Sequence, residues 1–139
     1  MHRLAGLRRR FACLGYECLV NAAILLLASF AFHAVVKSAA HPEQLRLAFQ
    51  IYLLLSLGGY YCWHWRRSGQ TLPMKTWRLR LVTTSGQLPG VTRALLRYIL
   101  AWVSVLCFGL GFLWAFLDAD GQFLHDRLLN TRIESADEP

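Results

Sequence analysis

Three long apolar stretches alternate with polar segments along the chain. The first runs for 26 residues from Phe11 to Val36, and the others cover residues 47–65 and 98–117. About 20 helical residues, each rising about 1.5 Å, are enough to cross a hydrocarbon core of roughly 30 Å. The first stretch also exceeds the apolar core of a signal peptide, which is about 7–15 residues long, so we expect it to be retained. The pattern predicts three transmembrane helices.

The polar segments give the expected division of the chain. Residues 1–10 form a basic arm, residues 11–133 form the transmembrane domain, and residues 134–139 form an acidic tail that we expect to be frayed. The longest polar segment, residues 66–97, separates the second and third apolar stretches. The second stretch ends in several aromatic residues that predict a belt at the membrane interface: Tyr60, Tyr61, Trp63 and Trp65.

One part of this polar segment has the period of a strand. Trp77, Leu79 and Leu81 alternate with Arg78 and Arg80, and successive side chains of extended backbone point to opposite faces. We therefore predict an all-α membrane protein with three transmembrane helices and a basic cytoplasmic loop that contains a short extended or interfacial segment.

The distribution of charge predicts the orientation. Four basic residues lie in the arm, two in residues 37–46, seven in residues 66–97 and two in residues 118–139. Segments rich in Lys and Arg stay on the cytoplasmic side, so the arm and residues 66–97 should both be cytoplasmic. With three full crossings, the C-terminal tail would lie outside.

Composition supports a membrane protein and argues against nucleic-acid binding. Apolar residues make up 55% of the chain, and the net charge of +7 comes from residues that flank the apolar stretches. We interpret these charges as topology signals, with the lipid bilayer as the partner, and we also consider anionic lipid as a partner of residues 66–97. The four cysteines lie inside or at the ends of apolar stretches without metal-ligand spacing. We expect neither a disulfide, nor a metal, nor another cofactor.

A polar group interrupts the first apolar stretch near its start. Glu17 and Asn21 are four residues apart and share one helix face, with Arg10 two turns earlier. An ionised carboxylate near the bilayer centre costs about 2.5–3.5 kcal/mol, so Glu17 needs a compensating neighbour. Helical side chains lean toward the N-terminus, so Arg10 should point to the headgroups. The partner of Glu17 should come from elsewhere in the chain or from a second subunit.

Four stretches together resemble one family of membrane proteins. They are Arg9-Arg10 with Tyr16-Glu17, the segment from Gly69 to Lys75, the segment from Trp77 to Leu81, and Leu124 to Leu128 with Thr131. In these stretches the chain resembles the RDD family of small bacterial membrane proteins.

The resemblance assigns family positions to residues of this chain. The family's arginine falls on Arg10, with Arg9 as the alternative. Its first aspartate position falls on Glu17 and its second on Asp126, while Pro73 stands where a glycine is usual. A glutamate at the first aspartate position keeps the carboxylate on a longer side chain. The proline puts in doubt any role that needs left-handed backbone at position 73. The other motif residues are Gly69, Gln70, Thr71, Lys75, His125 and Thr131.

Two functions follow from these residues and from the resemblance. The first is a structural or accessory component of the bacterial cytoplasmic (inner) membrane, whose polar cluster fixes helix packing and which acts with a membrane-protein partner. The alternative, which the resemblance implies, is a cation/proton-coupled transporter that works as a homo-oligomer. Its site would hold Arg10, Glu17, Asn21 and Asp126. We expect no enzyme, because the chain has no recognisable nucleophile–base arrangement, phosphate-binding glycine loop or metal motif.

The resemblance also creates a conflict over topology. If Asp126 approaches Arg10 or Glu17, it must lie in the cytoplasmic half of the membrane, whereas a straight third span would carry it to the far side. A re-entrant segment broken at Gly109–Gly111 would bring it back, and such backbone is tolerated where protein or water covers it. We expect three straight spans, with re-entry as the alternative.

Overall fold

Most of the chain is helical, and one small sheet joins two distant segments. The computed structural model describes residues 5–36 and 42–136. The elements in chain order are α1 (Leu7–Val35), α2 (Pro42–Arg67), α3 (Leu72–Thr76), β1 (Leu79–Thr83), α4 (Val91–Leu106), α5 (Leu110–Leu113), η1 (Trp114–Phe116), α6 (Leu124–Leu128) and β2 (Thr131–Ser135).

Helix α1 carries the first apolar stretch. It begins at Leu7 rather than Phe11, so that Arg8–Arg10 of the predicted arm belong to the helix, and the first four residues of that arm lie outside the described residues. Side chains such as Leu27 and Phe30 are exposed on it. By length and hydropathy, α1 can cross a membrane. An apolar helix with its side chains exposed is what a lipid-facing surface requires.

Helix α2 contains the second predicted span, residues 47–65. It begins at Pro42, where a proline fits because the first backbone N–H of a helix has no intrahelical partner. It ends at Arg67, and Gly69, with a φ of +70°, donates its N–H to the carbonyl of His64. Helix α2 packs on both α1 and α4. Among the described helices, α1 alone qualifies by itself as a span, because the polar residues of α2 lower its hydropathy.

The third predicted span, residues 98–117, is not one helix, so the expectation of a straight span there is wrong. Helix α4 ends at Leu106, and the α5–η1 segment that follows is bent from it by 102°. Phe108 and Gly109 lie between them with positive φ values of 56° and 75°. The Gly109 N–H donates to the carbonyl of Ser104 at 2.7 Å, which closes the end of α4.

The face that α4 buries is made of small and polar residues. Ala94, Arg97 and Ser104 are buried, whereas Ile99 and Val103 are exposed. This is the reverse of a helix in a water-soluble protein, where the apolar stripe turns inward. The arrangement fits a helix whose outer face meets lipid and whose inner face meets protein.

Two short strands from distant parts of the chain form the sheet. β1 and β2 pair antiparallel, with Leu81 opposite Ile133 and Thr83 opposite Thr131. The predicted extended segment is therefore present, two residues later than expected, at Leu79–Thr83. Its partner β2 was not predicted, and the expectation that the tail frays from residue 134 is wrong for Glu134 and Ser135, which lie in β2. Residues 137–139 lie outside the described residues.

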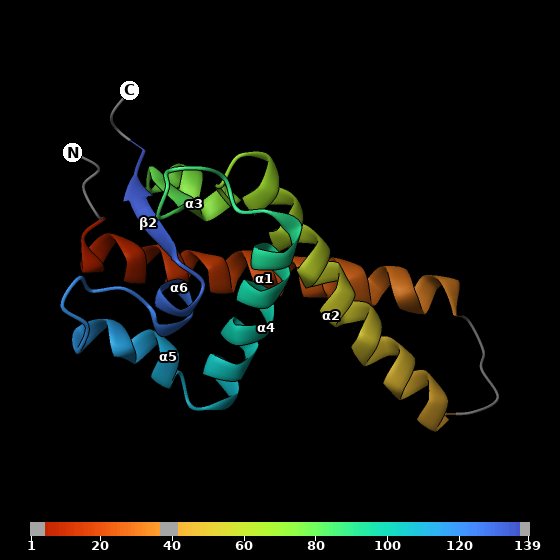
Figure 1. Cartoon of the computed structure of the whole chain (residues 1–139). Coiled ribbons are helices and arrows are strands. Elements are labelled where there is room, and N and C mark those ends of the chain that lie inside the picture. The colour runs from red at the N-terminus through yellow and green to blue at the C-terminus, as the bar shows by residue number, and fades with distance from the viewer. Residues whose placement is uncertain (1–4, 37–41, 137–139) are drawn as a thin grey trace.

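The sheet and the short helices α3 and α6 form a unit that we call the cap. Its interior contains Leu79, Leu81, Phe123 and Ile133, all buried. The cap covers the N-terminal end of α1, where the Ala5 N–H donates to the carbonyl of Ile133 at 3.2 Å. Figure 1 shows the start of α1, α3 and β2 together at one end of the molecule, while α1 and α2 extend away from them.

Candidate functional site

Glu17 is compensated by hydroxyl groups from two other elements. It is 8% exposed, and its Oε1 accepts a hydrogen bond from the Thr71 hydroxyl at the start of α3. Its Oε2 accepts one from the Tyr61 hydroxyl of α2 at 3.0 Å. The expectation that the partner comes from elsewhere in the chain is therefore correct. The partners are hydroxyl donors rather than a cation, and both lie in this same chain.

Asn21 joins Glu17 through the same tyrosine. The Tyr61 hydroxyl lies 2.8 Å from Asn21 Oδ1 and 3.0 Å from Glu17 Oε2, but a hydroxyl has one proton to donate. If the Asn21 amide turns over, its NH₂ group donates to the tyrosine oxygen, and the tyrosine proton is left for Glu17. Such a chain from Asn21 through Tyr61 to Glu17 satisfies all three groups.

Arg10 turns inward rather than toward the headgroups, so that expectation is wrong. It is 2% exposed, and one of its terminal nitrogens donates to the carbonyl of Gly121 in the loop before α6. It also interacts electrostatically with Asp126 and Asp118. The cap covers this end of α1, and burial under the cap outweighs the tendency of the side chain to lean toward water.

Asp126 pairs with an arginine that the sequence interpretation missed. Its Oδ1 lies 2.8 Å from a terminal nitrogen of Arg97, with both side chains buried, and it also accepts from the Thr131 hydroxyl at 3.2 Å. The Arg97 guanidinium stacks over the Trp65 ring at 4.8 Å. The charge pattern alone classes Arg97 with the topology signals, and the aromatic pattern places Trp65 in the interfacial belt. The available signal was that Arg97 shares a helix face with Ala94 and the small residues that follow it.

His125 lies in an apolar aromatic setting beside this ion pair. Its ring is 5.2 Å from Phe112 and 5.6 Å from Phe123. Burial lowers the pKa of His125 to about 4; Asp126 acts in the opposite direction, and Arg97 lowers it further. The imidazole is therefore neutral at physiological pH, and its Nδ1 has no hydrogen-bond partner among the described residues.

The remaining motif residues build the backbone that positions Thr71. Gly69 has a φ of +70°, and a Cβ there would lie 2.6 Å from the carbonyl oxygen of Leu81, so only glycine fits. The Gln70 side chain donates to the carbonyl of Leu79 at 2.8 Å. Thr71 is the N-cap of α3, with Pro73 in the first turn, where a proline is compatible with a helix. The left-handed position is Gly69, and Lys75 is exposed.

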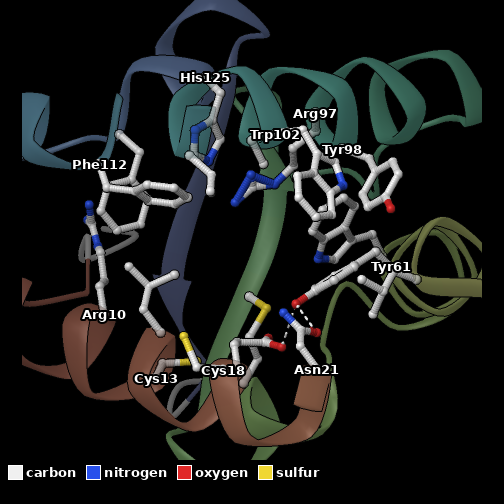
Figure 2. A pocket seen from close by; sticks show the side chains of 18 of the residues that line it. Arg10, Cys13, Cys18, Asn21, Tyr61, Arg97, Tyr98, Trp102, Phe112 and His125 are labelled. Carbon is white, nitrogen blue, oxygen red and sulfur yellow. Dashed lines mark hydrogen bonds between the residues drawn. The ribbon is translucent and has the colours of Figure 1, made fainter. Parts of the chain in front are cut away.

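A cavity of about 630 Å³ lies between α1, α2, α4 and the cap. Figure 2 shows Arg10, Cys13, Cys18 and Asn21 on one side and Arg97 and His125 on the other, all turned toward the same space. Glu17 and Tyr61 also line it. Of the four predicted cluster residues, Arg10, Glu17 and Asn21 line the cavity, and Asp126 reaches it through its pair with Arg97.

The candidate metal-ligand side chains are dispersed within the described residues. Within them no three His, Cys, Asp or Glu side chains come together in a way that could hold a metal ion. All four cysteines are free. The ionisable groups of the cluster instead engage one another, backbone carbonyls and hydroxyls.

The fold and cluster define a small helical membrane protein with a polar group inside its helix packing. The chain matches the family model of the RDD family over residues 4–130 and belongs to that family. The resemblance drawn from its motifs is thereby confirmed. No curated protein and no solved structure matches the chain significantly.

Proposed function

We propose that this chain is a structural or accessory component of the bacterial inner membrane, in which the polar cluster fastens the α1–α2 hairpin to the cap. The observation that carries the proposal is that each charged group of the cluster already has a partner on another element. Glu17 is bound by Thr71 and Tyr61, Arg97 by Asp126, and Arg10 by the carbonyl of Gly121 in the loop before α6. Polar contacts between membrane helices average about 0.6 kcal/mol, so several together specify one packing arrangement.

The proposal includes a membrane arrangement in which α1 and α2 cross and the α4–α5 segment re-enters. The pairing of β1 with β2 supports it, because hydrogen-bonded strands must lie on the same side of a bilayer. The bend of 102° after α4 allows the chain to return to the side of the membrane from which α4 starts. With the basic segment 66–97 in the cytoplasm, the N-terminus of α1 and the strand at 131–135 are cytoplasmic too.

Anionic headgroups of the cytoplasmic leaflet are the proposed partner of the basic segment. Its basic residues are exposed except for Arg97, which is withdrawn into the pair with Asp126. Each Lys or Arg near an anionic surface contributes about 1 kcal/mol. This contact requires the cap to lie on the cytoplasmic side of the membrane. Cysteine labelling at positions 85 and 130 tests that placement. The exposed residues are Arg66, Arg67, Lys75, Arg78, Arg80 and Arg93.

A second candidate, cation/proton-coupled transport by an oligomer, is favoured by one observation. Three oxygen-bearing side chains lie together along one wall of the cavity. They are the Glu17 carboxylate, the Asn21 amide and the Tyr61 hydroxyl. A carboxyl that exchanges a proton for a cation beside neutral oxygen ligands is the chemistry that an antiporter needs. In this alternative the three oxygen-bearing side chains hold the cation, and Glu17 carries the proton.

Proteoliposomes separate the two candidates. Purified wild-type protein, the Glu17→Gln variant and empty vesicles are compared for cation-driven proton efflux with a pH-sensitive dye. A structural or accessory role predicts that wild type equals empty vesicles. Exchange in wild type that is abolished by Glu17→Gln would contradict that role and support transport through Glu17. Equal exchange by both proteins above empty vesicles would contradict both candidates as stated here.

A further inference from the structure

The cavity changes character along its length. Its wall on α1 extends from Arg10 to Leu25, which is about 22 Å at about 1.5 Å per residue. Arg10 lies at the end under the cap, together with Arg97 and His125. Toward the other end, beside Tyr98 and Trp102, the wall consists of apolar side chains of α1, α2 and α4. They are Ala22, Leu25, Leu57, Ala101 and Val105.

Three nitrogen atoms at the capped end have no hydrogen-bond partner among the described residues. The two that belong to arginines are donors, whereas the role of His125 Nδ1 depends on its tautomer. Arg10 Nε, Arg97 Nε and His125 Nδ1 are buried without a hydrogen-bond partner among the described residues, and all three residues line the cavity. The nearby carboxylate of Glu17 is already satisfied, because each of its two oxygens accepts a hydrogen bond from a hydroxyl group. Asp126 Oδ2 is also unpaired, but Asp126 is not a lining residue. Buried polar groups without a partner are costly, so this end favours a ligand that supplies acceptor oxygens.

The wall of the cavity is open on the side that would face lipid. Cys18, Ala22 and Val105 line the cavity and are exposed. They lie on α1 and α4, whose neighbouring apolar side chains, such as Leu19 and Val103, are also exposed. A molecule dissolved in the bilayer can therefore enter sideways between these helices without crossing water.

We propose that the cavity binds a single-chain amphiphile with an anionic head, placing the head at Arg10, Arg97 and His125 and the alkyl chain between α1, α2 and α4. A cavity of about 630 Å³ lies within the range of about 300–1,000 Å³ that is usual for small-molecule sites. The two arginines can bind either a carboxylate or a phosphate head. The alkyl chain packs against Leu25 and Leu57, which line this part of the cavity. The proposal does not require the exchange activity considered above, whose residues Glu17, Asn21 and Tyr61 line the same cavity.

Two native cysteines make the proposal testable in the full-length protein. Cys18 lines the mouth of the cavity, whereas Cys107 is exposed but lies outside it. The protein is placed in nanodiscs of uncharged lipid, and the rates at which a lipid-soluble maleimide labels the two cysteines are followed by peptide mass spectrometry. The ligands are palmitate and lysophosphatidate, with hexadecanol and hexadecyltrimethylammonium as matched chains that lack the anionic head.

Anionic ligands should protect Cys18 and leave Cys107 unchanged. At a ligand concentration about ten times its Kd, the labelling rate of Cys18 should fall about ten-fold, because only the unliganded protein reacts. Protection by palmitate identifies a carboxylate head, and protection by lysophosphatidate identifies a phosphate head. Equal protection by hexadecanol or by the ammonium compound would overturn the proposal, as would protection by no ligand, because water would then satisfy the unpaired nitrogens.

A matched pair of variants on α4 tests the position of the alkyl chain. Val105 lines the cavity and Val103 does not, and both are exposed on the same helix, so neither change should prevent folding. Val105→Trp should fill the mouth and abolish the protection of Cys18 by the anionic ligand, whereas Val103→Trp should keep it. Unchanged protection in Val105→Trp would contradict the site.

Discussion

At the residue scale, Glu17 is held by the hydroxyls of Thr71 and Tyr61, and Arg97 is held by Asp126. Glu17 stood out because a carboxyl below the lipid surface is costly, and it is indeed compensated. Tyr61 could not be recognised, because a tyrosine at the end of an apolar stretch is also typical of the interface. Arg97 was counted with the exposed arginines of its segment, since the sequence does not say that Asp126, 29 positions later, returns to meet it.

His125 predicts a measurable dependence of stability on pH. Its pKa is about 4 in the folded protein and about 6.5 in an unfolded chain, so the unfolded state binds the extra proton between these values. The free energy of unfolding is therefore highest above pH 6.5 and falls as the pH drops toward 4, with a slope of at most about 1.4 kcal/mol per pH unit from this residue.

The His125→Phe variant tests this dependence. Phenylalanine keeps an aromatic ring between Phe112 and Phe123 but cannot take up a proton. Unfolding of both proteins is measured by denaturant titration at several pH values from 7 down to 4. The variant should lose part of the slope that wild type shows below pH 6.5. Identical slopes in the two proteins would contradict the burial of a neutral His125.

At the element scale, the long helices were predictable, and the break in the third apolar stretch was not. The first two stretches form α1 and α2 because nothing in them stops a helix. The third contains Gly109 and Gly111, which either allow close helix packing or end a helix. Local sequence does not choose between these roles. The choice depends on the cap, because its contacts with α4 and α5 form only when the chain turns back and they stabilise that turn.

Gly111 provides the test of this turn. A Cβ at position 111 would lie 2.7 Å from the Cβ of Ser104, so Gly111→Ala must push α5 away from α4. We expect a loss of about 1–3 kcal/mol, as for other overpacked positions, measured as a lower midpoint of thermal unfolding. Gly59→Ala is the matched control, because nothing lies within 4 Å of its Cβ position. The double variant Ser104→Gly with Gly111→Ala should recover stability. Equal melting of Gly111→Ala and Gly59→Ala would contradict the close approach.

At the scale of the whole molecule, the pairing of β1 with β2 determines how the chain can sit in a membrane. Charge counting predicts that the arm and residues 66–97 are cytoplasmic, and this orientation stays a prediction. Charge counting could not predict the side of the tail, because acidic residues contribute little to orientation. The contact between the two strands involves residues about 50 positions apart, and a non-local pairing of this kind leaves no local signal. We therefore propose a re-entrant segment in place of the third crossing.

Cysteine accessibility at two neighbouring positions tests this arrangement most directly. The Thr84 N–H donates to the carbonyl of Asn130 at 3.0 Å, so Ser85→Cys and Asn130→Cys are placed separately in a chain whose four native cysteines are replaced by alanine. A membrane-impermeant maleimide is applied to intact spheroplasts and to inverted vesicles. The account predicts that both positions are protected in spheroplasts and labelled in inverted vesicles. Labelling of position 130 in intact spheroplasts, with position 85 protected, would contradict it.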